Sequence, residues 1–167
     1  MGIRKIYCWL EEMLSRKLRL SSILNQVKDK RVLMRVDFNV PIKEGVLKDV
    51  TRIRSAIPTI DAVFNAGARS VILMSHLGRP DGQRSEKDSL KHIVGSVEKL
   101  AKRSVTFLPE CVGRDVEAAC ANPKPGSLIL LENLRFHAEE EGQGVKNGTK
   151  FKPKPEAVQL FRQSLTR

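Results

Sequence analysis

The sequence predicts an α/β fold, in which a parallel, Rossmann-like sheet forms the middle of three layers and helices cover both of its faces. Two observations lead to this class. Short aliphatic and β-branched runs alternate along the chain with longer segments whose apolar residues recur at helical spacing, which is the pattern of βαβ units. The length of 167 residues suits one ordinary domain.

The first half of the chain gives two strands and the helix between them. Residues 31–38 (RVLMRVDF) are typical of a buried strand, and the run ends before Pro41. Residues 51–67 place isoleucines and valine on one helical face, and Gly67 marks the end of this helix. The apolar run at 70–76 (SVILMSH) predicts the second strand.

The second half continues the same alternation. Ser89 is a candidate N-cap for a helix that reaches about Lys102. The polar segment 139–148, which has three glycines without dinucleotide-binding spacing, is interpreted as a flexible loop. The remaining elements are a third strand at 104–110, a short helix at 113–121, a fourth strand at 126–135 and a last helix at 155–165.

Composition narrows the class of protein. The hydrophobic fraction of 41% and the charged fraction of 29% are typical of a globular domain, and no apolar stretch is long enough to span a membrane. Thirty Lys and Arg against nineteen Asp and Glu give a net charge of +11, which predicts affinity for anions. Cys8, Cys111 and Cys120 have neither zinc-site spacing nor an even number, so we expect free thiols, no metal site and a cytoplasmic location.

Residues 1–16 form an atypical basic extension. Apolar residues at helical spacing, with Arg4 and Lys5 beside them, predict an amphipathic helix. Glu11 and Glu12 interrupt the apolar run too early for a secretory signal. A helix docked on the domain, a poorly ordered extension, and a membrane or organelle address all stay open for this segment.

Polar side chains collect where the predicted strands end. In open parallel sheets, ligands bind beyond the carboxyl ends of the strands. Arginine binds carboxylate and phosphate oxygens with its planar fork, whereas Asp and Asn suit a hydroxyl on the same molecule. Each residue alone has a plainer role in a turn or on a solvated surface, but together they predict a site for a phosphorylated hydroxy acid. The set comprises Asp37, Asn39, Arg52, His76, Arg79, Glu132, Asn133 and Arg135.

Four of these segments resemble signature segments of phosphoglycerate kinase, and they occur in the family's order with near-matching spacing. The resemblance covers residues 17–167 and implies part of the N-terminal, 3-phosphoglycerate-binding domain of a two-domain hinge kinase. The segments are RVDFNVP at 35–41, TRIRSAIPTI at 51–60, LMSHLGRPDG at 73–82 and LLENLRFH at 130–137.

The resemblance also implies roles for individual residues. Asp37 and Asn39 would hold the hydroxyl and carboxylate region of the substrate. His76 and Arg79 would close on it, and Arg135 would bind its phosphate. Arg52 would be the catalytic arginine that stabilises the phosphoryl group in transfer between 1,3-bisphosphoglycerate and MgADP. The full substrate set is Asp37, Phe38, Asn39, Arg52, His76, Leu77, Gly78, Arg79 and Arg135.

The family implies ATP or ADP and Mg²⁺ as well, but no phosphate-binding loop motif occurs in the sequence. We expect the nucleotide-binding domain to be absent from this chain, which leaves the chain inactive on its own. The family's strand order of three-four-two-one-five-six implies that the sheet is incomplete at its C-terminal end, with the first strand as an open edge.

Alternative functions stay open at this point. The chain could be a 3-phosphoglycerate-binding fragment, or a non-catalytic interaction protein that uses the open sheet edge or the N-terminal helix. We expect a monomer in the full-length family, although an open edge promotes association. Nucleic-acid binding ranks last, because only 5% of the residues are aromatic and no binding motif occurs.

Overall fold

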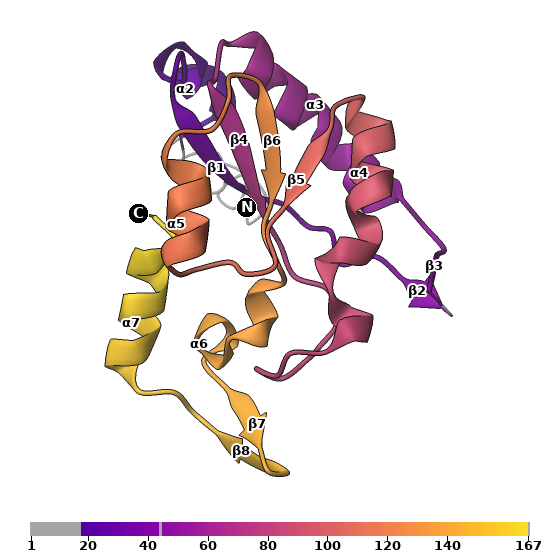
Figure 1. Ribbon diagram of the computed structural model, residues 1–167, viewed down its shortest axis with the longest axis vertical. Helices are drawn as coiled ribbons and strands as arrows, with labels where there is room; N and C mark the ends of the chain where they lie inside the picture. Colours follow the sequence, from indigo (N-terminus) through magenta and orange to yellow (C-terminus); the bar gives the residue numbers. More distant parts are fainter. Residues whose placement is uncertain (1–17, 44, 167) are drawn as a thin grey trace, which may run out of the picture.

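A four-stranded parallel sheet lies at the centre of the computed structural model, which describes residues 18–43 and 45–166 (Figure 1). The predicted extension at 1–16 and Cys8 lie outside the described residues. Within the described ranges, no helix is long and apolar enough to cross a membrane. In spatial order the strands are β1 (Arg31–Arg35), β4 (Ser70–Met74), β6 (Ser127–Leu130) and β5 (Val105–Phe107).

All three strand pairs are parallel and have a continuous register. Arg31 of β1 pairs with Ser70 of β4, which in turn pairs with Ser127 of β6. Val105 of β5 pairs with Leu128. If only the four strands of this sheet are numbered along the chain, β1, β4, β5 and β6 are the first to the fourth, and their spatial order is one-two-four-three. This is the order that the family resemblance implies. In the described part of the chain β1 is an edge strand.

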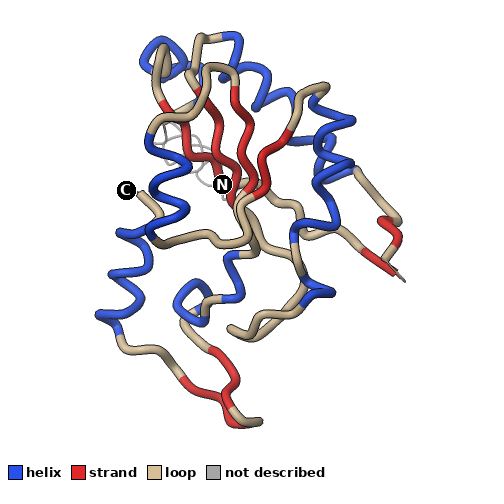
Figure 2. The backbone as a smooth tube through the Cα atoms, viewed as in Figure 1, coloured by secondary structure: helices blue, strands red, loops and turns tan. Residues whose placement is uncertain are grey.

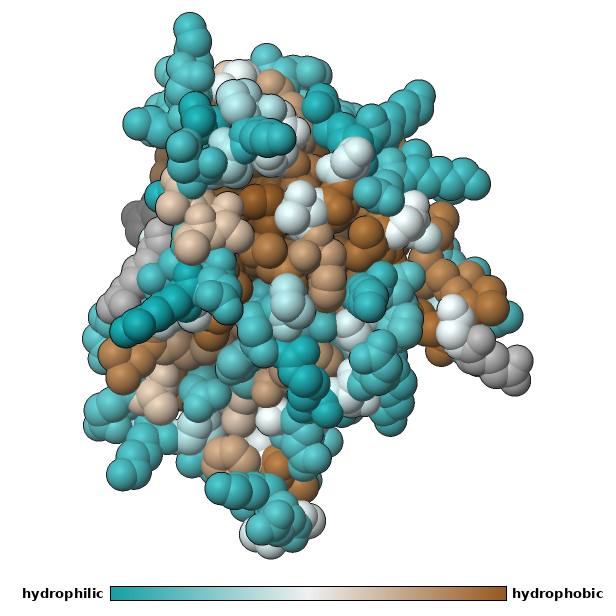
Figure 3. All heavy atoms as spheres, viewed as in Figure 1, coloured by the Kyte–Doolittle hydropathy of each residue, from teal (hydrophilic) through white to brown (hydrophobic). Residues whose placement is uncertain are grey.

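Helices cover both faces of the sheet, as predicted (Figures 1 and 2). Alternate residues of β4 point to opposite sides: Val71 and Leu73 belong to one apolar core and Ile72 to a second. The first core is closed by α3 (Thr51–Asn65) and α4 (Val94–Ala101). The second is closed by α5 (Arg114–Ala121) and α7 (Pro155–Ser164). In the space-filling view, apolar residues show over the middle of the molecule, whereas hydrophilic residues cover the outer helices and the lower end (Figure 3).

The predicted fourth strand is too long at its carboxyl end. Strand β6 stops at Leu130, and the chain turns into a 3₁₀ turn, η4 (Leu134–Phe136). The turn begins where Glu132 and Asn133 point into the protein. The Glu132 carboxylate accepts hydrogen bonds from Ser89 and Leu90, and the Asn133 amide donates to the carbonyls of Leu77 and Asp88. The predicted helix at 89–102 is confirmed with a modification: Ser89 accepts a hydrogen bond from the Lys91 amide, and a 3₁₀ turn, η3 (Leu90–Ile93), precedes α4.

The predicted flexible loop at 139–148 is wrong. This segment contains α6 (Ala138–Glu141) and β7 (Gly144–Lys146), which pairs with β8 (Thr149–Phe151). Asn147 and Gly148 both have positive φ, 51° and 75°, which is the backbone of a two-residue hairpin turn. The Asn-Gly pair could have predicted this hairpin from the sequence.

Five further small elements were not anticipated. β2 (Ile42–Lys43) and β3 (Val46–Leu47) form a second hairpin before α3. The one-turn α2 (Leu20–Ile23) and η1 (Leu24–Gln26) precede β1, and both pack leucines against the first core. A further 3₁₀ turn, η2 (Glu86–Asp88), lies in the connection between β4 and α4.

Candidate functional site

The site is built where three strands end side by side. The segments that follow β1, β4 and β6 are joined by hydrogen bonds beyond the sheet. The Phe38 amide donates to Oγ of Ser75 over 2.9 Å, and the Leu134 amide donates to the Ser75 carbonyl over 3.0 Å. Ser75 is fully buried. One serine therefore brings the polar residues that follow β1 and β6 to the loop that follows β4.

We call the polar residues at these strand ends the rim: Asp37, Asn39, Arg52, His76, Gly78, Arg79 and Arg135. Asp37 and Arg52 form an exposed ion pair on this rim. The Arg52 guanidinium, on the first turn of α3, donates to Oδ2 of Asp37, and the Asn39 amide donates to Oδ1 over 3.1 Å. Partial burial acts to raise the pKa of Asp37, but the Arg52 hydrogen bond, the Asn39 amide and the charges of Arg52 and His76 outweigh it and lower this pKa. The carboxylate is therefore ionised at neutral pH, and about half of each side chain is exposed.

The loop after β4 is fixed at Gly78 from two sides. Its amide donates to Oδ1 of Asn39 over 3.0 Å, and its carbonyl accepts from Nη1 of Arg135 over 3.2 Å. Gly78 has a φ of 65°, and a Cβ at this position would collide with the Asp88 carboxylate. Only glycine fits here without strain, so the loop geometry depends on this residue.

His76 lies half-buried beside the same loop. Burial is the main cause that lowers its pKa, and the positive charges of Arg135 and Arg35 act in the same direction. Asp37 and Glu140 act against this effect without cancelling it. The imidazole is therefore neutral at pH 7, with one nitrogen able to donate a hydrogen bond and the other able to accept one.

Arg135 meets acidic partners that the sequence interpretation missed. Its Nε lies 2.9 Å from Oε1 of Glu141 and 3.6 Å from Oε2 of Glu140, although its buried N–H makes no well-directed hydrogen bond. Glu140 also accepts from Nη2 of Arg35 at 2.5 Å. The signal that could have found this cluster is the run of three glutamates shortly after Arg135. An anion that binds Arg135 must compete with these carboxylates of α6.

Arg79 is an available cation on the same loop. Its side chain is exposed, and within the described residues it has neither a hydrogen bond nor an ion pair. It follows Gly78, whose backbone is fixed by Asn39 and Arg135. The structure thus places a free guanidinium on a rigid backbone at the edge of the rim.

Four residues that the sequence analysis placed in the ligand-binding set or in the strand-end pattern do not present their side chains to the rim. Phe38 and Leu77 are buried in the first core, and their peptide groups are already bonded, to Ser75 and to Asn133. Glu132 and Asn133, which the strand-end pattern grouped with the ligand-binding residues, are 3% and 0% exposed. Their assignment to the ligand surface is wrong, because both side chains are buried and form hydrogen bonds with groups inside the protein.

A pocket of about 600 Å³ opens beside the rim. It is bordered by Asn39 and Gly78 on one side and by Lys87 and His92 on the other. A smaller and more apolar pocket of about 190 Å³ lies between the sheet, α5 and α7. Among residues 18–43 and 45–166, no group of three or more His, Cys, Asp and Glu residues could hold a metal ion.

The comparison with known sequences identifies consistent relatives. A family model described as "Phosphoglycerate kinase" matches residues 22–166. A phosphoglycerate kinase of Sterkiella nova is 58% identical over 154 residues, which cover 92% of this chain and 37% of that protein. A phosphoglycerate kinase of Tetrahymena thermophila is 53% identical over 155 residues, which also cover 92% of this chain and 37% of that protein.

Solved structures agree with this. The crystal structure of phosphoglycerate kinase from Pyrococcus horikoshii OT3 superposes with a TM-score of 0.68 at 30% identity, over 89% of this chain and 35% of that one. The structure of phosphoglycerate kinase from Coxiella burnetii superposes with a TM-score of 0.60 at 34% identity, over 72% of this chain and 28% of that one. The chain thus spans about a third of the length of the relatives that it matches.

Proposed function

The chain belongs to the phosphoglycerate kinase family, and from this premise we propose that its rim of strand ends binds 3-phosphoglycerate. The observation that carries the proposal is the convergence of Arg52, Arg79 and Arg135 on one edge of a parallel sheet, around a neutral histidine. Phosphoryl transfer between 1,3-bisphosphoglycerate and ADP, as the activity of the whole family protein, belongs to the same proposal.

The arginines supply the anion-binding part of this proposed site. A bidentate guanidinium contact suits both the carboxylate and the phosphate of 3-phosphoglycerate. Arg79 is ready to bind because no described residue occupies its guanidinium. Arg52 is held by Asp37, and Arg135 by Glu140 and Glu141, so binding would exchange these protein carboxylates for the carboxylate or the phosphate of the ligand. Such preformed pairs hold each guanidinium near its working position.

The remaining polar groups supply orientation. Asp37 has a free carboxylate edge beside Arg52 and can accept a hydrogen bond from the ligand hydroxyl. His76, with its lowered pKa, can donate one hydrogen bond from a neutral ring to a ligand oxygen without adding charge. Asn39 is used to fix the Gly78 amide, which supports an indirect role for its side chain.

Catalysis by this part of a kinase would consist of positioning and charge stabilisation. Arg52 is the proposed catalytic residue, because its exposed guanidinium lies at the rim and can neutralise charge on a phosphoryl group in transfer. Mg²⁺ and nucleotide, which the family implies, would supply the donor side. The described residues offer no carboxylate cluster for the metal, so no step of this proposal passes through it.

Titration calorimetry with 3-phosphoglycerate tests the proposal directly. We expect saturable binding to the 167-residue chain, and Arg79→Ala is expected to weaken it about 10- to 100-fold, the effect of one lost charge-assisted hydrogen bond. Arg162→Ala, an exposed substitution of equal charge on α7, is the matched control and should leave the affinity unchanged. Absence of binding, or equal loss in both variants, would contradict the proposal.

A coupled assay tests the prediction that the chain is inactive by itself. We expect no ATP-dependent turnover of 3-phosphoglycerate by the purified 167 residues, because no phosphate-binding loop motif occurs in them. Turnover that Arg52→Ala abolishes would contradict this prediction while supporting the proposed role of Arg52. A cytoplasmic location and a monomeric state stay predictions; the free thiols of Cys111 and Cys120 support the first.

A further inference from the structure

Asn133 is a fully buried polar side chain that bonds to the loop after β4 and to the turn that carries Arg135. Its Nδ2 donates to the Leu77 carbonyl over 2.7 Å and to the Asp88 carbonyl over 2.8 Å. Its Oδ1 accepts from the Arg135 amide over 3.0 Å. One amide side chain therefore closes the loop between Leu77 and Asp88 and, with its other end, starts the turn that carries Arg135.

Glu132 holds the same loop from the adjacent position. Its Oε2 accepts from the Ser89 hydroxyl over 2.7 Å, and its Oε1 accepts from the Leu90 amide over 2.9 Å. Oε1 also accepts from the Asn133 amide over 2.7 Å, which fixes the backbone of its neighbour. A buried carboxylate without partners would be costly, so these three bonds are needed for its burial.

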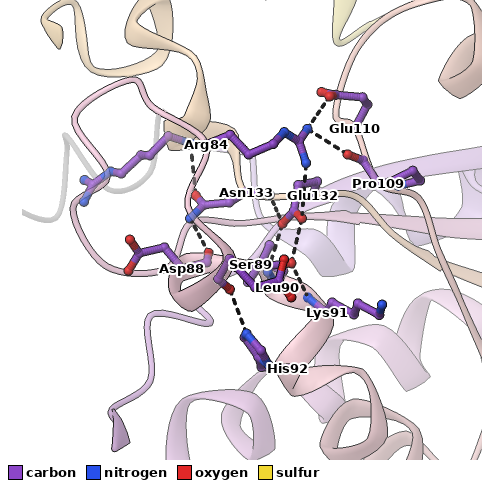
Figure 4. A network of polar contacts seen from close by, with 12 residues as sticks. Arg84, Asp88, Ser89, Leu90, Lys91, His92, Pro109, Glu110, Glu132 and Asn133 are labelled. Atoms are coloured by element: carbon purple, nitrogen blue, oxygen red, sulfur yellow. Dashed lines mark hydrogen bonds and ion pairs between the residues drawn. The ribbon is translucent and has the colours of Figure 1, made fainter. Parts of the chain in front are cut away.

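Arg84 connects this buried pair to the end of β5. Figure 4 shows its guanidinium directed at Glu110 and the Pro109 carbonyl, with Glu132 below. Its Nη1 lies 3.9 Å from Oε2 of Glu132. The loop that begins at Leu77 is thus held at both ends and in its middle by groups from the ends of β5 and β6.

We propose that Asn133, supported by Glu132, is a positioning residue that sets Arg79 and Arg135 for binding of one anionic ligand. The ligand part of this inference rests on the proposed function. Asn133 does not touch the rim; it acts through the backbone of Leu77, the residue before Gly78, and through the backbone of Arg135. Its amide is needed because only a side chain with two donors and one acceptor satisfies all three groups.

Hydrogen exchange of the 167-residue chain tests the positioning part without any ligand. Asn133→Asp keeps the shape and the acceptor but removes both donors. We expect the Gly78 and Leu90 amides to exchange at least about tenfold faster, the effect of one lost hydrogen bond between buried groups. Amides in α3 and β5 should keep their protection. Asn122→Asp, an exposed change of equal charge at the opposite end of the sheet, is the control and should change neither amide.

A second variant covers the outcome in which Asn133→Asp does not fold. Ser89→Ala removes one of the three bonds to Glu132 and the cap of the Lys91 amide, while Asn133 stays in place. It should accelerate exchange at Leu90 by a smaller factor. Unchanged exchange in both variants, or acceleration spread evenly over the whole sheet, would overturn the inference in favour of a purely structural role.

Calorimetry with 3-phosphoglycerate tests the ligand part. We expect Asn133→Asp to weaken binding about tenfold in the otherwise unchanged chain, but less in an Arg79→Lys background, because the two residues act through one contact. Equal losses in both backgrounds would overturn the coupling to Arg79. If the unchanged chain does not bind 3-phosphoglycerate, the proposed function and the ligand part fail together, and the exchange result alone decides whether Asn133 positions the loop.

Discussion

The two ends of the parallel sheet differ in how their polar groups are used. At the amino end, the turns are joined through the backbone: the Arg69 amide donates to the Lys30 carbonyl over 2.8 Å, and the Gly126 amide donates to the Arg69 carbonyl over 2.8 Å. The buried Ser70 hydroxyl at this end has no hydrogen-bond partner in the described part of the chain.

At the carboxyl end, buried side chains connect the loops instead. Five polar or charged residues are buried in the described ranges, and all but Ser70 lie at this end: Ser75, Ser89, Glu132 and Asn133. Buried polar groups are costly unless they are bonded, and at the carboxyl end these side chains bond to the loops that they connect. The difference indicates that buried side-chain networks fix the loops at the carboxyl end of the sheet, where Arg52, Arg79 and Arg135 lie.

The largest expected effect comes from Asn133→Leu. This change leaves the Leu77 and Asp88 carbonyls and the Arg135 amide without their partner. We expect a loss of about 3–5 kcal/mol in the free energy of unfolding, since each buried unpaired group costs about 1–3 kcal/mol. Urea denaturation measures it. The exposed Asn122→Leu at the amino end should cost less than about 1 kcal/mol, and equal losses would contradict the comparison.

Gly78→Ala is expected to have the next largest effect. The new Cβ meets the Asp88 carboxylate and requires a positive φ, so we expect a loss of about 2–3 kcal/mol in the free energy of unfolding. Gly126→Ala at the amino end is a matched control, because its φ is 82° but nothing lies near the added Cβ. It should cost only about 1 kcal/mol. Equal losses would show that the contact with Asp88 is unimportant.

Two serines at opposite ends of β4 sharpen the comparison further, because both are fully buried. Ser75→Ala leaves the Phe38 amide without its acceptor, and we expect it to cost about 1–2 kcal/mol. Ser70→Ala removes an unpartnered hydroxyl and should be neutral or stabilise the protein by up to about 1 kcal/mol. Thermal unfolding of both variants tests this pair, and the reverse order of stabilities would contradict it.

The sequence predicted the sheet well and the site only in outline. Aliphatic runs and helical periodicity were sufficient for the four strands and their covering helices, because burial of apolar residues decides both. The same rule failed at Glu132 and Asn133, since a polar pair after an apolar run looks alike whether it faces a ligand or the interior. The direction is decided by loops that are more than forty residues away in the sequence, at Leu77, Asp88 and Ser89.

The acidic partners of Arg135 illustrate a second limit. The positive net charge and the strand-end arginines predicted a basic rim, and the exposed Arg79 agrees with that prediction. Glu140 and Glu141 reach Arg135 because α6 folds back beside it, within a segment that looked like a flexible loop. The net charge therefore agrees with the exposed Arg79, but it could not predict that two carboxylates lie beside Arg135.

The smallest expected effect is a pH dependence from His76. Burial, aided by Arg135, lowers the pKa of its imidazole in the folded protein. Below about pH 6.5, its ordinary value, the unfolded chain binds a proton that the folded protein still excludes, so stability falls as the pH decreases toward the folded pKa. The effect is small, because solvent still reaches part of the ring.

Urea denaturation at pH 7.5 and pH 5.5 measures this decrease, and NMR titration of the ring gives its pKa directly. His76→Gln should lose less stability over this interval than the unchanged chain, whereas Arg162→Gln should lose as much. Arg135→Met removes the second cause, so it should shift the titration of His76 upward. A ring that titrates at or above its ordinary value would show that the carboxyl end of the sheet does not keep this histidine neutral, and the proposed uncharged donor beside the arginines would be lost.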